Sequence, residues 1–346
     1  MKQLTLAIAL GLAAAAGVAQ ARDNIEIVGS STVYPFATVV AEQFAKKSGG
    51  AAPKIESTGS GGGFKLFCAG AGIETPDITN ASRRMKKKEL ETCAKNGVDA
   101  VTEVKVGYDG ITIGSAKSGE PLNISRRDLF LALAKNVPTA DGTFVPNPYT
   151  TWKQINPAMP DVKIEVLGPP ATSGTRDALV SLGMKKGALN FKGIPELEKK
   201  DSAAFKKLYK EVREDGHFIE MGENDNLIVQ KLKANPSAFG IFGYSFYDQN
   251  RDNLQAATID GTEISYDNIS TGKYPLSRPL FFYVKNSHVG QVKGIKEYMA
   301  EFTSEAALSA DGYLAEKGLV AMPEAEKKAT MAAAAALTPL SASALK

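Results

Sequence analysis

Three short stretches of the sequence gather Ser, Thr and Gly where a strand-like run gives way to a helix-like run. They are "GSSTV" at Gly29–Val33, "TGSGGG" at Thr58–Gly63 and "TSGTR" at Thr172–Arg176. A helix N-terminus presents unpaired backbone N–H groups and about half a positive charge. Ser and Thr add hydroxyl donors, and Gly lets a ligand approach the backbone closely. Each stretch therefore has the chemistry of an anion-binding site.

Any one of these stretches alone is explained by ordinary helix capping, because Ser and Thr are preferred N-cap residues. Three of them favour a shared anion site, since strand-to-helix junctions of an open α/β sheet lie where ligands bind. If the first two belong to one lobe and the third to another, they can surround one tetrahedral oxyanion. Arg176 ends the third stretch, and a fourth junction, "PDITNASR", places Arg83 after Ser82, so both can offer a guanidinium to the anion.

Catalytic and metal-binding patterns fit the sequence less well. The residues around Ser173 miss the nucleophile-elbow pattern, and "TGKY" at Thr271 lacks the upstream Gly of a P-loop. His217 and His288 are far apart in sequence and lack Cys or carboxylate neighbours at ligand spacing. We therefore expect no enzymatic activity, no metal and no cofactor.

The elements that must position these stretches alternate between strand and helix through the first half of the chain. "NIEIVGSS" reads as a strand, and the apolar residues from Val33 to Phe44 then recur at helical spacing until Gly49 stops the run. The same strand-to-helix order recurs at the other three junctions. This alternation is typical of an α/β protein with a mostly parallel sheet.

Two long extended segments, Val101–Ala116 and Tyr274–Asn286, stand before and after a middle block of helices and loops. A chain that leaves one lobe and later returns predicts two lobes with a double hinge. We assign residues 22–107 plus 278–346 to lobe 1 and residues 108–277 to lobe 2. Within lobe 2, "KNVPTADGTFVPNPYTTW" predicts a surface loop. The Ala-rich tail from Pro323 predicts a loosely held or partly disordered helix.

The bulk composition is that of an ordinary globular protein. The 346 residues are 43% hydrophobic and carry a formal net charge of +3 without a long basic run, which does not favour nucleic acid as a partner. "RRMKKK" at Arg83–Lys88 is the densest basic spot, and a solvated helix face is its simplest explanation.

The first residues follow the plan of a secretory signal peptide. Lys2 precedes an apolar stretch, and "AQA" at Ala19–Ala21 is a small-x-small cleavage site, so residues 1–21 are expected to be removed after Ala21. An uncleaved membrane anchor is the alternative. Export to a Gram-negative periplasm favours a disulfide between Cys68 and Cys93, with two buried free thiols as the other interpretation.

Six stretches, in order, resemble the phosphate-binding proteins of Pst-type ABC importers. They are "GSSTVYPF", "STGSGGGFK", "DITNASRRMK", "SGTRD", "PSAFGIFGYSF" and "YPLSRPLFFYV", and the similarity runs from Ile25 to Val320. The resemblance implies the type II periplasmic-binding fold, in which two α/β lobes with a two-strand hinge hold phosphate between them. It implies ligand roles for Ser31, Thr32, the backbone of Val33, Ser60, Ser173, Gly174 and Thr175.

The sequence departs from the family pattern at two positions. Well-known members have an Asp after the Ser of the fourth junction, where Arg83 stands, and an Arg four residues before the "SGT" Ser, where Pro169 stands. Part of the family instead has an Arg after "SGT", as Arg176 does. The missing Asp accepts the proton of phosphate, and we expect Asp109, or otherwise Asp177, to replace it.

The resulting prediction is a monomeric periplasmic phosphate-binding protein that delivers inorganic phosphate to the membrane permease of an ABC importer. The alternatives are a binding protein for another oxyanion, such as sulfate or molybdate, a secreted phosphoesterase, and a surface or scaffold protein that binds no oxyanion.

Overall fold

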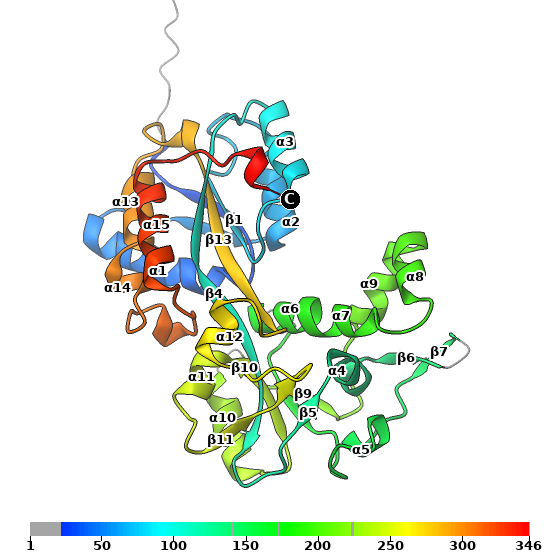
Figure 1. The fold of residues 1–346 in the computed structure, drawn as a ribbon. Coiled ribbons are helices and arrows are strands. Elements are labelled where there is room, and N and C mark those ends of the chain that lie inside the picture. Colours follow the sequence, from blue (N-terminus) through cyan, green and yellow to red (C-terminus); the bar gives the residue numbers. More distant parts are fainter. Residues whose placement is uncertain (1–21, 140–141, 172, 223–224, 346) are drawn as a thin grey trace, which may run out of the picture.

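Two α/β lobes are joined by two long strands in the computed structural model, which describes residues 22–139, 142–171, 173–222 and 225–345 (Figure 1). The predicted signal peptide lies outside the described residues. One curled sheet runs through both lobes in the order β2-β1-β3-β13-β4-β10-β8-β9, with β11 paired to β4. The predicted two-lobed α/β class is confirmed. The sheet is mixed rather than mostly parallel, because the two joining strands run antiparallel to their neighbours.

The first lobe carries the N-terminal strands and the C-terminal helices. Its elements, apart from the joining strands, are β1 (Glu26–Gly29), α1 (Tyr34–Ser48), β2 (Lys54–Ser57), α2 (Gly59–Phe67), β3 (Ile78–Ala81), α3 (Lys87–Lys95), η2 (Asn286–His288), α13 (Ile295–Phe302), α14 (Glu305–Leu308), η3 (Ala315–Lys317), α15 (Glu324–Ala335) and η4 (Ala342–Ala344). Helix α1 buries Phe36, Val40 and Phe44 on one face and ends where Gly49 takes a left-handed backbone, as the apolar spacing predicts.

The second lobe holds the middle of the chain. Its elements are β5 (Asn123–Ile124), α4 (Arg126–Leu133), β6 (Asn136–Pro138), β7 (Phe144–Pro146), α5 (Trp152–Ile155), β8 (Val166–Gly168), α6 (Gly174–Ala178), η1 (Leu179–Met184), α7 (Lys185–Ala188), α8 (Ile194–Lys200), α9 (Ser202–Lys210), β9 (Phe218–Glu220), α10 (Asp225–Ala234), β10 (Phe239–Gly243), α11 (Tyr244–Asp248), β11 (Leu254–Ala256), β12 (Thr258–Ile259) and α12 (Tyr266–Ser270). The segment predicted as a surface loop contains the small antiparallel hairpin of β6 and β7.

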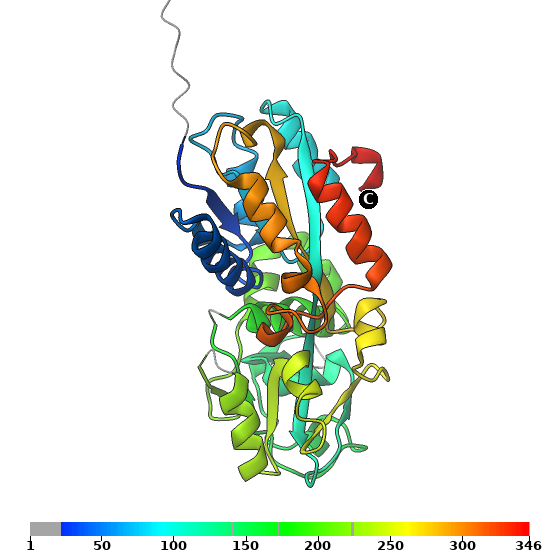
Figure 2. The ribbon, with the colours of Figure 1, turned by 90° about the vertical axis from the view of Figure 1, so that its left-hand side faces the viewer.

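The joining strands are β4 (Val101–Ala116) and β13 (Ser277–Lys285), within the two predicted extended segments. Strand β4 pairs with β13 up to Gly110 and with β10 from Ile111 onward, so it belongs to the sheets of both lobes. Figure 2 shows the same cyan strand passing from one lobe into the other. The antiparallel register sets Arg278 of β13 opposite Asp109 of β4.

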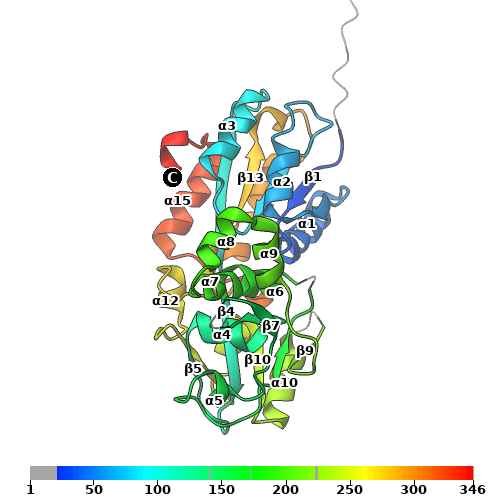
Figure 3. The ribbon, with the colours of Figure 1, turned by 90° about the vertical axis from the view of Figure 1, so that its right-hand side faces the viewer.

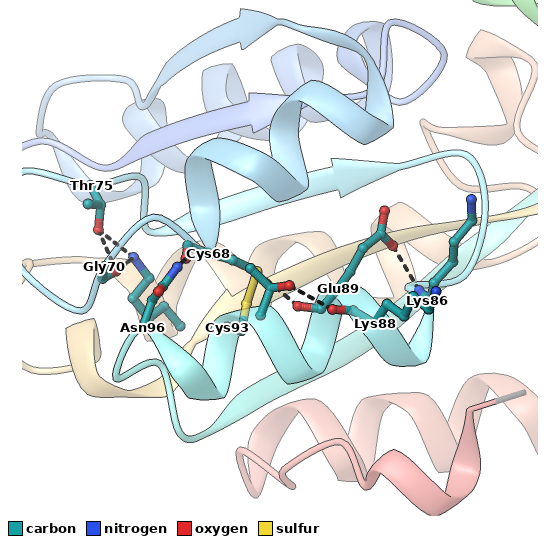
Figure 4. Close-up of a disulfide and its surroundings, with 10 residues drawn as sticks. Cys68, Gly70, Thr75, Lys86, Lys88, Glu89, Cys93 and Asn96 are labelled. Carbon is teal, nitrogen blue, oxygen red and sulfur yellow. Dashed lines mark hydrogen bonds between the residues drawn. A yellow bond between two sulfur atoms is a disulfide. The ribbon is translucent and has the colours of Figure 1, made fainter. Parts of the chain in front are cut away.

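A disulfide joins Cys68, at the end of α2, to Cys93 in α3, which confirms the predicted pairing (Figure 4). Both cysteines are buried in a small apolar cluster that includes Phe67 and Tyr283. The side chain of Asn96 donates to the carbonyl of Cys68 over 2.7 Å, which adds a second link between the two helices. The disulfide therefore fixes α2 and α3 on the same face of lobe 1.

The Ala-rich tail is more firmly attached than its composition predicts. Glu326 of α15 accepts hydrogen bonds from Lys105 over 2.6 Å and from the Tyr108 hydroxyl over 2.7 Å, both on β4. Beyond α15, the Leu340 N–H donates to the carbonyl of Val101 over 2.7 Å. Polar contacts with β4 therefore hold a helix that has little apolar surface of its own to bury.

Candidate functional site

The β1–α1 junction supplies the first group of hydroxyls. The Oγ of Ser30 accepts the backbone N–H groups of Thr32, at 3.2 Å, and Val33, at 3.4 Å, so it holds the turn before α1. The Thr32 side chain is buried, and Ser31 is half-buried. The sequence favours this turn because Pro35 is tolerated at the start of α1, where a backbone N–H has no helical partner.

The second group lies beside the first at the N-terminus of α2. Gly63 packs so closely on β1 that a Cβ there would lie 2.6 Å from the Cα of Gly29, which explains the glycine at this position. Ser60 accepts the backbone N–H of Ser82 over 3.0 Å, and their two hydroxyls lie 3.3 Å apart. The junctions after β1, β2 and β3 therefore meet at one edge of the lobe 1 sheet.

The third group opens the continuous helical segment α6–η1–α7 in lobe 2. Ser173 is its N-cap, and the Ser173 Oγ accepts the N–H of Thr175 over 3.2 Å. Thr172 lies outside the described residues. Gly174 and Thr175 are half-buried at the first turn of the helix. This junction follows β8 and opens α6, which lies next to lobe 1 (Figure 1).

The first and third groups are in direct contact across the two lobes. The Thr32 hydroxyl donates to the carbonyl of Gly174 over 3.3 Å. A Cβ on Gly174 would lie 2.3 Å from the Cα of Thr32, so only glycine permits this approach. The hydroxyl clusters that the sequence places 142 residues apart are thus brought to one point.

Arg278 is the cation at this point, and it does not belong to the predicted set. Its side chain is 8% exposed and comes from β13, between the lobes. One guanidinium nitrogen, Nη2, donates to the Thr32 Oγ1 over 2.6 Å and lies 3.4 Å from the Gly174 carbonyl oxygen. Arg278 therefore contacts both lobes at the place where they meet.

Two carboxylates flank Arg278. Its Nε lies 3.4 Å from the Asp109 Oδ2, and its Nη1 lies 3.3 Å from the Asp177 Oδ2. Burial raises the pKa of the Asp109 carboxyl above its usual value, and the Arg278 guanidinium opposes that rise. The Asp177 side chain is 52% exposed, so water screens its charge much more. Of the two predicted acceptors, Asp109 is the more enclosed, with a side chain that is 12% exposed.

The two predicted arginines have other partners. Arg83 forms a two-pronged ion pair with Glu89, with nitrogen–oxygen distances of 2.9 and 2.7 Å, and stacks over the Phe64 ring. Arg176 donates to the carbonyl of Pro169 over 3.1 Å and lies over the Phe218 ring. Burial lowers the pKa of Arg176. Neither contact set includes the hydroxyls at the meeting point of the lobes.

A signal for Arg278 was present in the sequence. "YPLSRPLFFYV" contains this arginine within one of the two crossing segments, and Asp109 lies in the other. Two antiparallel strands at a hinge can bring such residues opposite each other. The register that does so cannot be obtained from the sequence pattern, because either segment can slip by two residues without changing which face is buried.

The geometry suits anion binding better than bond cleavage. The Arg278 guanidinium contacts one hydroxyl from each lobe, Thr32 and Ser181, beside the helix N-termini at Thr32 and Gly174. Hydroxyls, backbone N–H groups and a guanidinium can all donate to an oxyanion. The ring nitrogens of His288 contact Asp77 and the carbonyl of Ala71, and the Nδ1 of His217 contacts the carbonyl of Ile164. These contacts occupy both histidines elsewhere in the two lobes.

Among the residues described, no group of three His, Cys, Asp or Glu side chains is arranged to hold a metal ion. None of the helices in the described part of the chain is long and apolar enough to cross a membrane.

Comparisons with known proteins point to one family. Residues 14–306 match the family model described as a PBP superfamily domain. The phosphate-binding protein PstS of Staphylococcus epidermidis is 30% identical over 313 residues, which cover 88% of this chain and 80% of that protein. Protein SphX of Synechococcus elongatus is 31% identical over 262 residues, which cover 74% of this chain and 66% of that protein.

Solved structures agree with these sequence matches. The crystal structure of a possible phosphate binding protein from Planctomyces limnophilus aligns with a TM-score of 0.70 at 26% identity, covering 92% of this chain and 99% of that one. An ABC-type phosphate transport receptor from Vibrio cholerae, with a TM-score of 0.58 at 21% identity, shares the fold.

Proposed function

The chain belongs to the PBP superfamily, in the family of the phosphate-binding proteins PstS, and we propose that it binds inorganic phosphate between its two lobes. It delivers the anion to the membrane permease of an ABC importer. In this proposal the protein binds and releases phosphate but catalyses no reaction, so no bond in the ligand is made or broken. The observation that carries the proposal is the convergence of Thr32, Gly174 and Arg278 from three distant parts of the chain.

The proposed ligand set joins the predicted hydroxyls to the newly found cation. Phosphate accepts from hydroxyls and backbone N–H groups at both helix N-termini, and the Arg278 guanidinium balances its charge. Micromolar capture requires about 8 kcal/mol, and a hydrogen bond to a charged group contributes about 1.5 to 3 kcal/mol. Several such bonds therefore suffice. The proposed set comprises Ser31, Thr32, Val33, Ser60, Ser173, Gly174, Thr175 and Arg278.

We assign Asp109 the role of proton acceptor for the bound phosphate. It is buried beside Arg278, where an ionised carboxylate accepts the proton that phosphate carries and sulfate lacks. Arg83 and Arg176 are left with supporting roles, since their guanidinium groups are engaged by Glu89 and by Pro169.

The remaining features of the proposal are supported by the signal-peptide pattern of the first residues, by the family and by the strand pairing. The chain is exported as a monomer after removal of residues 1–21 and acts in the periplasm. Residues 22–107 plus 278–346 form lobe 1, and residues 108–277 form lobe 2. The change of β4 partner between Gly110 and Ile111 supports a boundary near the start of lobe 2. Rotation about β4 and β13 then opens and closes the site.

The proposal is tested by calorimetric titration of the mature protein with phosphate, compared with a triple variant. Ser31→Ala, Ser60→Ala and Thr175→Ala together remove hydroxyl donors from both lobes, and we expect phosphate affinity to fall by about 100-fold or more. Ser343→Ala, at an exposed position near the C-terminus, is the matched control. Undiminished binding by the triple variant would refute the site.

Sulfate affinity is expected to depend on pH through Asp109. Above the pKa of Asp109 its carboxylate repels sulfate, and below it the neutral carboxyl can donate to sulfate. Because burial raises this pKa, sulfate affinity should rise as the pH falls from about 8 to about 5, earlier than an ordinary Asp would allow. Asp109→Asn should raise sulfate affinity at about pH 8 by roughly 10- to 100-fold and remove the pH dependence.

Asp177→Asn is the control for this pH series. Its exposed side chain should change sulfate affinity only a few-fold, since exposed charges contribute little. Equal rejection of sulfate by wild type and Asp109→Asn, with the pH dependence lost in Asp177→Asn instead, would assign the acceptor role to Asp177.

A further inference from the structure

Lobe 2 carries an exposed basic surface that the phosphate site does not use. Residues 185–210, which contain α7, α8 and α9, include eight lysines against three carboxylates. Seven of the eight are exposed: Lys186, Lys192, Lys199, Lys200, Lys206, Lys207 and Lys210. We call the part formed by Lys199, Lys200, Lys206, Lys207 and Lys210 the lysine face.

Helix α9 gathers its lysines on one side. Phe205, Leu208 and Tyr209 are buried against the lobe, and Lys206, Lys207 and Lys210 lie on the opposite, exposed side of the helix, starting one turn after Ala203. Lys199 and Lys200 end α8, directly before the Asp201 that caps α9. Both groups of lysines are therefore exposed on the α8–α9 pair.

Glu198, Asp201 and Glu214 lie close to this surface in the sequence and are engaged elsewhere, whereas Glu196 and Glu211 adjoin it and form no ion pair among the described residues. Glu198 pairs with Lys185 at 2.9 Å, and the Asp201 carboxylate accepts two N–H groups at the N-terminus of α9. Glu214 pairs with Lys135. Among the ion pairs formed by the described residues, none includes a member of the lysine face. Its lysines therefore remain available to bind an anionic partner outside the chain.

The lysine face does not take part in the contacts of the proposed phosphate site. Helix α9 packs against η1 and α7 through its buried side, and Lys206, Lys207 and Lys210 lie on its exposed side. The hydrogen bonds of Thr32 and Arg278 include no member of the lysine face. Holding the bound phosphate therefore does not account for these lysines.

The composition of the face favours a diffuse anionic surface over a folded protein partner. Protein interfaces are enriched in Arg and aromatic residues and depleted of Lys. The exposed side of α9 offers lysine and alanine, and its aromatic residues, Phe205 and Tyr209, are buried. Lysine ammonium groups on flexible stems are suited to phosphate headgroups in an anionic bilayer.

We propose that the lysine face docks the protein on the anionic phospholipid headgroups of the membrane that contains its permease. This inference rests on the proposed function, because a substrate-binding protein of an importer must meet its permease at that membrane. Figure 3 views the molecule from the side on which α8 and α9 lie in front, with α2 and α3 of lobe 1 above them. Docking through α8 and α9 turns the side that bears α2, α3, α8 and α9 toward the bilayer.

The test is sedimentation of the full mature protein with vesicles of phosphatidylcholine, with and without phosphatidylglycerol, at low and physiological ionic strength. The face variant changes all five lysines to glutamine. A control variant of equal charge changes five exposed lysines scattered over other surfaces: Lys46, Lys163, Lys231, Lys273 and Lys328. Calorimetry with phosphate is run on all three proteins.

We expect wild type and the control variant to bind phosphatidylglycerol vesicles, with binding weakened by salt, and the face variant to bind roughly tenfold less or worse. Soluble glycerol phosphate at the same concentration as the headgroups should not compete. Equal loss in the two variants, equal binding to neutral vesicles, or competition by glycerol phosphate would overturn the proposal. Phosphate affinity should be the same in all three proteins, so a failure of the proposed function would appear separately, as absent phosphate binding in wild type.

Discussion

Arg278→Gln is expected to lower phosphate affinity by roughly 100- to 1,000-fold. The guanidinium is buried, contacts both lobes, and donates to the Thr32 hydroxyl over 2.6 Å. Truncating one partner of a buried charged pair costs about 2 to 5 kcal/mol, much of it from the charge left behind. Calorimetric titration with phosphate measures the loss directly.

The same substitution leaves Asp109 without its partner, which could weaken the fold as well as the site. Loss of the positive neighbour also removes the effect that holds the pKa of Asp109 down, so the carboxyl takes up a proton more readily. The double variant Arg278→Gln with Asp109→Asn removes both charges. It should recover most of the lost unfolding free energy in denaturant titration and still fail to bind phosphate tightly.

Arg176→Gln is the control that separates the two arginines. Its guanidinium lies against the carbonyl of Pro169 and the Phe218 ring, away from Thr32. We expect a much smaller loss of phosphate affinity than for Arg278→Gln. The opposite order, with Arg176→Gln abolishing binding and Arg278→Gln tolerated, would return the cationic role to the residue that the sequence motif suggests.

Gly174→Val is expected to prevent the lobes from closing and to weaken phosphate binding by about 100-fold or more. A Cβ at this position would lie 2.3 Å from the Cα of Thr32, which is backbone and cannot turn aside as a side chain can. The steric conflict exists only when the lobes meet, so each lobe should fold normally. Small-angle scattering with and without phosphate should show less compaction than in wild type.

Gly50→Val provides the matched control for this substitution. Gly50 is exposed on lobe 1, and the nearest atom to an added Cβ is the Ser48 hydroxyl at 3.4 Å. This variant should bind phosphate and compact as wild type does. If Gly174→Val also bound and compacted normally, the contact between Thr32 and Gly174 would have no part in ligand capture.

Local patterns in the sequence predict much of the scaffold. The four strand-to-helix junctions depend on short-range signals: apolar periodicity, capping hydroxyls and glycine stops. Strands β4 and β13 were also predictable, because long extended runs on either side of the middle block imply a chain that crosses twice. The disulfide between Cys68 and Cys93 followed from an even cysteine count in an exported protein.

Sequence patterns predict less about the centre of the site. Arg278 reaches Thr32 across 246 residues, and its role depends on the register of two antiparallel strands. Arg83 and Arg176 were predicted from their positions beside hydroxyls. Their preference for Glu89 and for Pro169 depends on tertiary packing, which the sequence pattern does not contain.

The C-terminal tail and the strand directions of the sheet were also not predicted correctly from local sequence patterns. Helix α15 has a weak apolar face, and its attachment through Glu326 to Lys105 and Tyr108 could not be inferred from composition. The prediction of a mostly parallel sheet holds for β1, β2 and β3 of lobe 1. It was wrong for the whole sheet, because β4 and β13 run antiparallel to their neighbours and β4 continues from the sheet of one lobe into that of the other.

The most direct test of the account is a crystal structure of the protein grown with arsenate, a tetrahedral analogue of phosphate whose arsenic atom can be located by anomalous scattering. The account predicts one strong arsenic peak between the lobes, with oxygens in contact with the Arg278 guanidinium and with the helix N-termini at Thr32 and Thr175. A structure with closed lobes and no arsenic there, or with arsenic bound only elsewhere on the surface, would contradict it.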